Sequence, residues 1–491
     1  MRSLIVWGTS SGAGKSWLAT ALCRLASRRG IDVVPFKAQN MSNNARVVAA
    51  SGGRLGEIGS AQYFQALAAR VVPHTAMNPV LLKPESDTAS QVVVNGVVDP
   101  VLSRTGWRER SGLLAQAARA SFRQLASQHE LIVIEGAGSP AEINLSEHDY
   151  VNLGVARWAQ KLGPTAALLV SDIDRGGAFA HVHGTWALLP DDLRGLLAGY
   201  VLNRFRGDAD LLAPGPQLLR QSTGLPLAGV IPLRRDHGLP EEDGWFPFGR
   251  TAETANAVLQ VAVLAPPHIS NLDEFQPLTR VPGLHLQWVR NLAQLHGADW
   301  IVLPGSKQTS GDLAWLRKRG LDTAIKRHAA AGRPVLGICG GLQMLGRMLD
   351  DPQGFDGAAV ADLAGLGLLP LSTHFGGHKH LSHGPVRFGG QTTAPWAALR
   401  HVSASAYQIR CGQTRAEPGA AVLFDEAGQA IGWQSGSVLG VCVHGLFESA
   451  AVLHALFGAS VPTLEDTFEL LADMAQDHLN PALLDRLLSG Q

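Results

Sequence analysis

Cysteine, net charge and long apolar runs are all scarce in this sequence of 491 residues, and each shortage excludes a class of protein. The four cysteines form no Cys-x-x-Cys pair, so neither a zinc knuckle nor a disulfide framework is indicated. Such cysteine usage is typical of a reducing compartment, and we expect a cytoplasmic protein. The 41 Lys and Arg residues balance 41 Asp and Glu residues. This balance gives no electrostatic reason to expect a nucleic acid or an anionic membrane as a partner.

No apolar run approaches the roughly 18 residues that a membrane-spanning helix needs. The run at 4–7 is too short for the apolar region of a signal peptide. We therefore expect no membrane association. Hydrophobic residues make up 46% of the chain, enough for sizeable cores. At roughly 100–200 residues per domain, the length favours two or three domains.

Short apolar runs alternate with helix-length segments, which predicts an α/β fold. Such runs are typical of strands buried on both faces of a parallel sheet. They form one series at 4–7, 131–134, 167–170 and 198–202, and a second at 261–264, 284–289, 300–303, 335–338 and 438–443. We predict a first domain at 1–235, a Pro-, Gly- and acid-rich linker at 236–257, a second domain at 258–450 and a C-terminal helical tail at 451–491.

A phosphate-binding loop follows the first predicted strand. Its glycines let backbone N–H groups converge on phosphate at the start of a helix. Lys15 is expected to reach the β- and γ-phosphates, and the Ser16 hydroxyl to contact Mg²⁺. The strict pattern has glycine where Thr9 stands, and a loop without a ligand is the alternative in a chain with 55 glycines. The strand–loop–helix context favours nucleotide binding, with Thr9, Gly12, Gly14, Lys15 and Ser16 as candidates.

Two charged residues follow other strands of the first series. Glu135 ends a buried strand, where ligands of α/β sheets bind, and it suits a Mg²⁺ ligand. A carboxylate that only caps a helix is the alternative. Lys37 is a candidate to neutralise a transferring phosphoryl group, with a solvated lysine as the alternative.

A cysteine at a tight turn is the candidate nucleophile of the second domain. Cys339 lies between a buried strand and a helical run, with glycines on both sides, as in a nucleophile elbow. The helix N-terminus favours thiolate there. The N–H of Gly340 and a group at Gly305 are candidates for an oxyanion hole. His444, at a strand end, is the candidate base, although a buried structural histidine is the alternative.

These motifs resemble those of the cobyric acid synthase family over nearly the whole chain. The first half is similar to the dethiobiotin synthetase type of P-loop domain. The second is similar to class I glutamine amidotransferases, whose Gly-x-Cys-x-Gly-x-Gln signature stands at 337–343. The longer strings that carry the resemblance lie at 35–44, 77–84, 135–144, 172–177, 203–208 and 303–307.

The resemblance implies a P-loop NTPase-type sheet with helices on both faces, followed by a class I amidotransferase-like α/β domain. It also implies amidation of the b, d, e and g carboxylates of (adenosyl)cobyrinic acid a,c-diamide. ATP, Mg²⁺ and L-glutamine are the implied cofactors and nitrogen donor, and the corrinoid is the implied substrate. Asn203 would contact adenine, and Glu57 would assist the metal or the substrate. An oligomer is compatible with the sequence.

Three departures from the family patterns matter. Class I amidotransferases usually have Glu two residues after the histidine, where this chain has Leu446, so we expect a Cys–His dyad. Glu448 would orient His444 only weakly. A family Gly-Tyr-Glu-Ile-His string has Gln408 and Arg410 at its acidic and histidine positions. Lastly, Gly12 stands where an acidic residue often precedes the Ala-Gly-Lys of the P-loop.

Two other functions fit parts of the pattern. One is cobyrinic acid a,c-diamide synthase or a related ligase with the same two halves, which the string that begins at Lys37 disfavours. The other is a non-catalytic P-loop switch carrying a degenerate amidotransferase domain. Glutamine hydrolysis that depends on Cys339 separates an enzyme from the switch.

Overall fold

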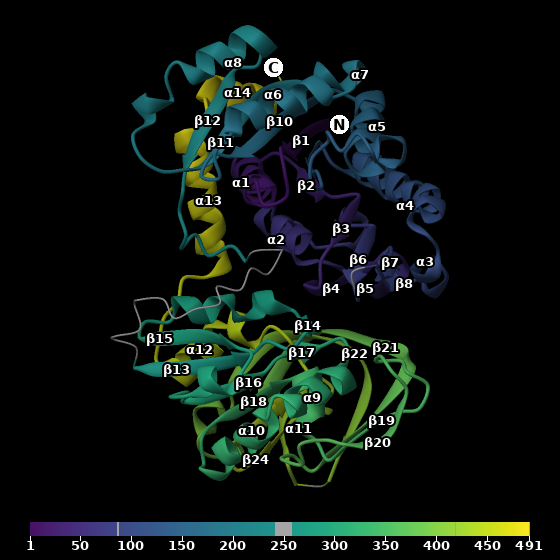
Figure 1. Ribbon diagram of the computed structural model, residues 1–491, viewed down its shortest axis with the longest axis vertical. Coiled ribbons are helices and arrows are strands. Elements are labelled where there is room, and N and C mark those ends of the chain that lie inside the picture. Colours follow the sequence, from purple (N-terminus) through teal and green to yellow (C-terminus); the bar gives the residue numbers. More distant parts are fainter. Residues whose placement is uncertain (86–87, 241–257, 418, 491) are drawn as a thin grey trace. The chain divides into compact units, whose positions relative to one another are not determined.

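The computed structural model describes residues 1–85, 88–240, 258–417 and 419–490. It contains two compact units, one made of Met1–Asp243 with Leu464–Gln491 and the other of Gly244–Thr463 (Figure 1). Within the described ranges, no helix is both long and apolar enough to cross a membrane.

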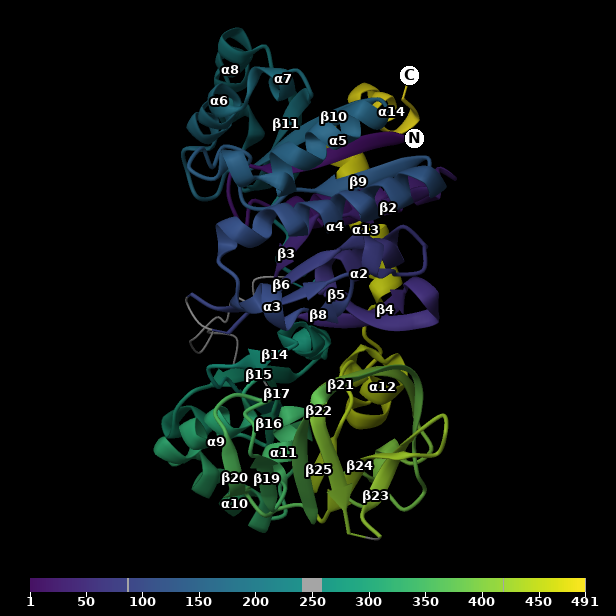
Figure 2. The ribbon, with the colours of Figure 1, turned by 90° about the vertical axis from the view of Figure 1, so that its right-hand side faces the viewer.

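A parallel sheet forms the centre of the N-terminal unit (Figure 2). Its strand order is β12-β11-β10-β1-β9-β2, and every neighbouring pair is parallel. The strands are β1 (Arg2–Gly8), β2 (Val33–Phe36), β9 (Leu131–Glu135), β10 (Thr165–Asp172), β11 (Leu197–Phe205) and β12 (Leu227–Pro232).

Helices cover both faces of this sheet, because side chains alternate along each strand. Ile5 and Trp7 of β1 belong to one apolar cluster, and Leu4 and Val6 to the other. The first cluster includes α4 (Trp107–Gln128), α5 (Val155–Leu162) and α6 (Ala178–Leu188), and the second includes α1 (Lys15–Arg28), α2 (Ser60–Ala68), α13 (Leu464–His478) and α14 (Pro481–Ser489). The prediction of a parallel sheet with helices on both faces is confirmed.

Smaller elements in the same unit were not predicted from the sequence. They include a sheet of β3 (Gln39–Met41), β6 (Val80–Pro84), β7 (Ser90–Val94) and β8 (Val97–Val98), and a hairpin of β4 (Ala45–Ala50) and β5 (Arg54–Gly59). The shorter helices are η1 (Ser51–Gly53), η2 (Thr75–Met77), α3 (Pro100–Arg104), η3 (Ser146–His148), η4 (Tyr150–Gly154), α7 (Asp191–Arg194), η5 (Ala209–Leu212) and α8 (Gly215–Thr223).

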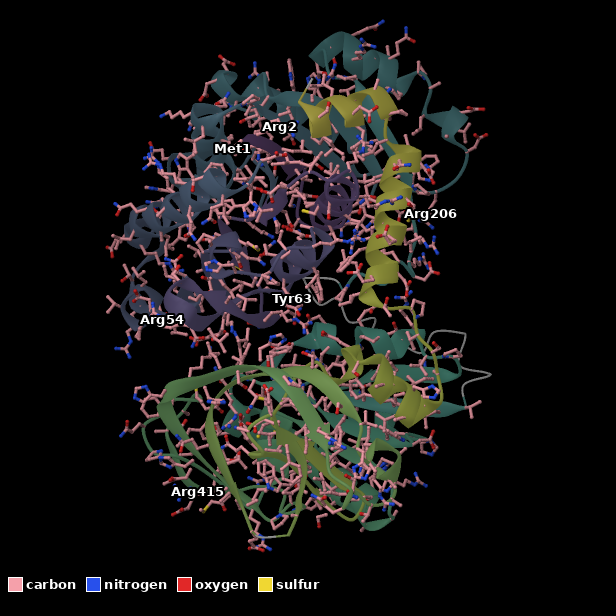
Figure 3. All side chains as sticks on the ribbon, turned by 180° about the vertical axis from the view of Figure 1, so that it is seen from behind. Met1, Arg2, Arg54, Tyr63, Arg206 and Arg415 are labelled. Atoms are coloured by element: carbon pink, nitrogen blue, oxygen red, sulfur yellow. The ribbon has the colours of Figure 1, made fainter. Side chains whose placement is uncertain are left out.

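The end of the chain returns to the N-terminal unit. Phe468 of α13 is fully buried, with the Arg24 guanidinium of α1 5.4 Å from its ring centre. Arg24 also contacts Glu465 at 2.6 Å. Arg2 lies against Gly490, just after α14. Figure 3 labels Arg2 beside the yellow helices. The segment 451–491, predicted as one tail, is thus divided, because α12 (Ala450–Phe457) lies in the other unit.

The C-terminal unit contains a mixed sheet of order β15-β13-β16-β18-β25-β24-β23-β21-β19-β20, with β22 beside β21. Its strands β15, β13, β16, β18 and β25 are parallel and match the predicted second series. The long antiparallel pair β21–β22 was not predicted from the sequence (Figure 2).

The strands of this unit are β13 (Leu259–Leu264), β14 (Ile269–Ser270), β15 (Leu284–Val289), β16 (Trp300–Leu303), β17 (Gly305–Ser306), β18 (Val335–Ile338), β19 (Met348–Asp351), β20 (Val360–Ala364), β21 (Leu371–Phe388), β22 (Ser403–Ala416), β23 (Ala421–Asp425), β24 (Ala430–Ser435) and β25 (Val438–Val441). Its remaining helices are η7 (Leu272–Arg280), η8 (Leu292–Leu295), α9 (Thr309–Lys318), α10 (Leu321–Ala330), α11 (Gly340–Leu345), η9 (Ala397–Leu399) and η10 (Leu446–Glu448).

Candidate active sites

The predicted phosphate loop joins β1 to α1 through glycines in the left-handed region. Gly12 has φ 70° and Gly14 has φ 103°. A Cβ on Gly14 would lie 1.9 Å from Asn203 Nδ2, which donates to the Ala13 carbonyl at 3.0 Å. Only glycine therefore fits at position 14, and Asn203 supports the loop from the end of β11.

Lys15 lies across its own loop. Its ammonium donates to the Ser10 carbonyl at 2.9 Å and to the Gly138 carbonyl at 3.0 Å. The second contact joins the phosphate loop to the segment after β9. Thr9 donates through its hydroxyl to Ser171 Oγ at 3.1 Å, which links the loop to β10.

Glu135 brings several predicted residues together at the end of β9. Its Oε1 accepts from the Ser16 hydroxyl at 2.8 Å and lies 2.9 Å from the Lys37 ammonium. Its Oε2 accepts from Gln62 and Gln65 of α2, which the sequence analysis did not identify. The structure thus places Ser16, Lys37 and Glu135 in one cluster beside the phosphate loop.

The Glu135 carboxylate is charged despite its burial. It is 1% exposed, and burial by itself raises its pKa. The positive charge of Lys37, with hydrogen bonds from Lys37, Gln65 and Ser16, outweighs burial and holds the pKa below its usual value. A buried anion with a hydroxyl neighbour is the donor set that Mg²⁺ prefers.

Glu57 lies in a different environment. On β5, it forms a buried ion pair with Lys83 of β6. The described partners of Glu135 are Ser16, Lys37, Gln62 and Gln65, and Glu57 is not among them. The expected role of Glu57 at the metal or the substrate stays a prediction.

Charged residues at the ends of β10 and β11 and just beyond them form another group at the same sheet edge. Asp172 Oδ2 lies 3.2 Å from Arg175 Nε and 3.1 Å from Arg204 Nη1. Arg206, labelled in Figure 3, donates from Nε to Asp174 at 2.7 Å. The family strings contain these residues, but sequence reasoning gave them no role. Arg175 also lies near Gly12, with Nη2 3.4 Å from the position a Cβ would take there.

Cys339 lies at a strained turn between β18 and α11. Its φ of 50° and ψ of −106° fall outside the regions that non-glycine residues ordinarily adopt. A Cβ on Gly341 would lie 1.9 Å from the Leu303 carbonyl oxygen, and one on Gly340 would lie 2.7 Å from the Ser306 amide nitrogen. Glycine at both positions lets the turn press against the loop after β16. Such strain is typical of a nucleophile elbow.

Backbone groups around this turn suit an oxyanion hole. The Gly340 N–H is the first of helix α11, and the initial N–H groups of a helix point away from its own carbonyls. Gly305 and Ser306 form β17, which pairs with β14. Because Ser306 lies directly against Gly340, the two predicted oxyanion segments are adjacent.

His444 is buried beside Gly305 and Cys339. A Cβ on Gly305 would lie 2.7 Å from His444 Cε1 and 3.6 Å from its Nε2. Burial alone lowers the His444 pKa, but the Glu274 carboxylate and the Cys339 sulfur outweigh burial and raise the pKa to about 10. The thiol, the imidazole and the candidate oxyanion segments therefore meet in one place.

The expected Cys–His dyad is incomplete as a description of this site. His444 Nδ1 lies 2.8 Å from Glu274 Oε1, and both residues are almost fully buried. Glu274 comes from η7, 170 residues before the histidine. The carboxylate sought at position 446 is thus supplied by a distant segment, which no pattern around His444 could indicate.

The segment 406–410, which differs from the family pattern at Gln408 and Arg410, lies beside His444 and Cys339. The Tyr407 ring stacks on His444, with centroids 5.5 Å apart. Ile409 O lies 3.6 Å from Cys339 Sγ. Gln408 donates to Ser382 and accepts from Arg410 Nε, both at 2.9 Å. The two atypical side chains therefore bind one another, while Tyr407 contacts the histidine.

Comparisons with known proteins agree with this geometry. Residues 4–244 match the family described as the CobQ/CobB/MinD/ParA nucleotide binding domain, and residues 260–452 the CobB/CobQ-like glutamine amidotransferase domain. The chain is 59% identical to the cobyric acid synthase of Methylibium petroleiphilum, covering 99% of this chain and 97% of that one. The cobyric acid synthases of Leptothrix cholodnii and Paracidovorax citrulli are each 57% identical over similar lengths.

This chain belongs to the cobyric acid synthase family. Members are glutamine-hydrolysing amido-ligases of cobalamin biosynthesis. The P-loop switch with a degenerate second domain is disfavoured, because the thiol elbow is intact and adjoins a histidine.

The other cysteines differ from Cys339. Burial raises the pKa of Cys442 to about 12, and burial also raises that of Cys23. Cys411 is partly buried within β22. In this cobyric acid synthase family member, burial of Cys23 and Cys442 favours their neutral thiols, whereas Cys339 lies at a helix N-terminus beside a histidine.

Gly341→Ala is expected to lower the rate of glutamine hydrolysis about 10²-fold. A methyl group would overlap the Leu303 carbonyl, so the turn that presents Cys339 must shift, and an ångström of displacement costs roughly 10²-fold in rate. Glutamate release measures the effect. Gly384→Ala is the matched control, since that glycine of β21 has open space around it. Parent-like hydrolysis by Gly341→Ala would contradict the tight elbow.

Proposed function

We propose that this chain converts (adenosyl)cobyrinic acid a,c-diamide to cobyric acid by amidating its b, d, e and g carboxylates with ATP and glutamine. The observation that carries the proposal is the near-complete match, at 59% identity, to a cobyric acid synthase. The separate clusters around Glu135 and Cys339 support it, since activating a carboxylate and releasing ammonia are different reactions.

In the glutaminase reaction, the Cys339 thiolate attacks the side-chain amide carbon of glutamine. The oxyanion that forms accepts hydrogen bonds from the Gly340 N–H and the adjoining β17 segment at Gly305. The C–N bond breaks as the His444 imidazolium gives its proton to the departing ammonia. Water then attacks the thioester, His444 removes its proton, and glutamate leaves with the thiolate restored.

In the synthetase reaction, a carboxylate becomes an acyl phosphate, because a free carboxylate is a poor electrophile. Ammonia then displaces phosphate. Lys15 and the loop N–H groups would hold the phosphates, and Lys37 would neutralise charge on the moving phosphoryl group. Thr9, Gly12 and Gly14 shape the loop, and Asn203, beside Ala13, is suited to the nucleotide's base end.

The residues present fit a Mg²⁺ ion. Ser16 Oγ and Glu135 Oε1 lie 2.8 Å apart, and both are hard oxygen donors. These two residues would hold the ion, which when bound offsets phosphate charge. Lys37 contacts the same carboxylate oxygen, Oε1, and its positive charge keeps Glu135 ionised when the metal ion is absent. We place the reaction in the cytoplasm, because no disulfide joins the four cysteines, all of which lie within the described ranges.

The product tests the proposal directly. With glutamine labelled by ¹⁵N in its side-chain amide, we expect cobyric acid carrying label at the b, d, e and g positions. Mass spectrometry and NMR of the corrinoid measure the number and the place of the labels. If the enzyme is offered cobyrinic acid and labels only its a and c positions, it is instead a diamide synthase.

Glu135→Gln is expected to raise the Mg²⁺ concentration needed for half-maximal synthesis by about tenfold or more. The amide keeps the shape of the side chain but removes the negative charge that faces Ser16. A Mg²⁺ titration of ATP-dependent amidation measures this, and glutamate release should not change.

Glu57→Gln is the comparison for this titration. Because Glu57 forms a buried ion pair with Lys83, we expect the Glu57→Gln protein to be less stable than the parent. We expect its Mg²⁺ requirement to stay at the parent value. If Glu135→Gln leaves the Mg²⁺ requirement unchanged, or if only Glu57→Gln raises it, the metal does not bind at Ser16 and Glu135.

A further inference from the structure

We propose that Glu274 is the positioning residue of the glutaminase site, holding His444 in the orientation and protonation state that Cys339 requires. The inference deepens the proposed function, on which it rests. It replaces the expected dyad with a Cys339–His444–Glu274 arrangement whose carboxylate comes from a separate part of the chain.

Both carboxylate oxygens of Glu274 face the histidine segment. Oε1 lies 2.8 Å from His444 Nδ1, and Oε2 accepts from the Gly445 N–H at 3.1 Å. Glu274 is 1% exposed and His444 is 2% exposed. A buried carboxylate that accepts from both a ring nitrogen and the next backbone N–H fixes the ring in position and angle.

The segment that carries Glu274 is anchored on both sides. Asn271, with φ 54°, turns the chain into η7, and its side chain donates to the Tyr407 hydroxyl at 2.7 Å. Phe275 is fully buried between Trp288 and Phe447, with ring centroids 5.6 and 6.1 Å away. Glu274 is therefore held by contacts to the same elements that flank His444, not by its own side chain alone.

The chemistry follows from which nitrogen carries the proton. A carboxylate only accepts, so Nδ1–H donates to Glu274, and the opposite edge of the ring is left for the thiol. Gly305 lies close to that edge, at Cε1 and Nε2. Nε2 can then take the Cys339 proton and later give one to ammonia.

Charge supports the same assignment. Glu274 from η7, Cys339 from the elbow and Tyr407 from β22 all face His444. The negative charge of Glu274 favours the imidazolium in a buried site where burial alone would disfavour it. The imidazolium in turn pairs with the thiolate.

Glu448 is the carboxylate nearest to His444 in sequence. Its backbone N–H donates to the Gly445 carbonyl within the η10 turn, and the described hydrogen bond to the His444 ring comes from Glu274. The two glutamates therefore make a matched pair of variants.

Glu274→Gln is the decisive variant. An amide has one acceptor, whereas Nδ1–H and the Gly445 N–H both need one. If the amide oxygen stays with Gly445, its NH₂ group faces Nδ1, which forces the ring proton onto Nε2 and removes the base. We expect the glutaminase kcat to fall about 10²-fold. The limb where activity falls at high pH should move to lower pH, because His444 loses the charge that favours its protonated form.

Three comparisons isolate the role of Glu274. Glu448→Gln should keep parent glutaminase rates and the parent pH profile. Glu274→Asp keeps the charge, so we expect it to recover part of the rate and to keep the high-pH limb near the parent position. Synthesis from ammonium chloride should be unchanged in all three variants. Circular dichroism and thermal unfolding check that each is folded.

Parent rates in a folded Glu274→Gln, or an equal or greater loss in Glu448→Gln, would overturn the assignment. Equal pH profiles for Glu274→Gln and Glu274→Asp, with equal rate losses, would also overturn it, since packing alone would then explain the loss. Glutamate release is measured without corrinoid. A wrong corrinoid substrate would therefore leave these results intact, and the two failures can be told apart.

Discussion

The burial of one carboxylate in each unit is the constraint on which both sites depend. Glu135 and Glu274 are each 1% exposed. An ion of this size loses several kcal/mol of hydration when it is buried, so each must gain charged or hydrogen-bonding partners. Lys37, Ser16 and Gln65 satisfy Glu135, and His444 with the Gly445 N–H satisfies Glu274. Among these partners, Lys37, Ser16 and His444 are also groups to which the proposed mechanism assigns roles in the two reactions.

Both sites also depend on tight turns that follow parallel strands. Ligands of open α/β sheets bind beyond the carboxyl ends of the strands. In one unit the turn after β1 needs glycine at position 14, where a Cβ would overlap Asn203. In the other, the turn after β18 needs it at position 341. In the proposed mechanism the first turn presents backbone N–H groups to phosphate and the second presents a thiol, so the same geometry would serve an electrostatic and a nucleophilic role.

What the sequence could predict was local. The phosphate loop, the Cys339 elbow, the strand-end His444 and the strand series are patterns of fewer than about ten residues, and the family resemblance joined them over nearly the whole chain. Glu274 could not be found this way, because its partner lies 170 positions later and η7 has no motif of its own. The Lys83 partner of Glu57 was missed for the same reason. The amphipathic pattern from Leu464 indicated packing, but only the folded chain shows α13 against α1.

The central claim is that activation of the carboxylate and release of ammonia take place at separate sites, and Cys339→Ala tests it most directly. Amide formation is measured with ammonium chloride at raised pH, where free ammonia is more abundant, and separately with glutamine. Lys15→Ala is measured in parallel and should make no amide from either source while still hydrolysing glutamine. The account predicts that Cys339→Ala makes amide from ammonium and none from glutamine. A folded Cys339→Ala protein that makes no amide even under saturating ammonium would contradict it.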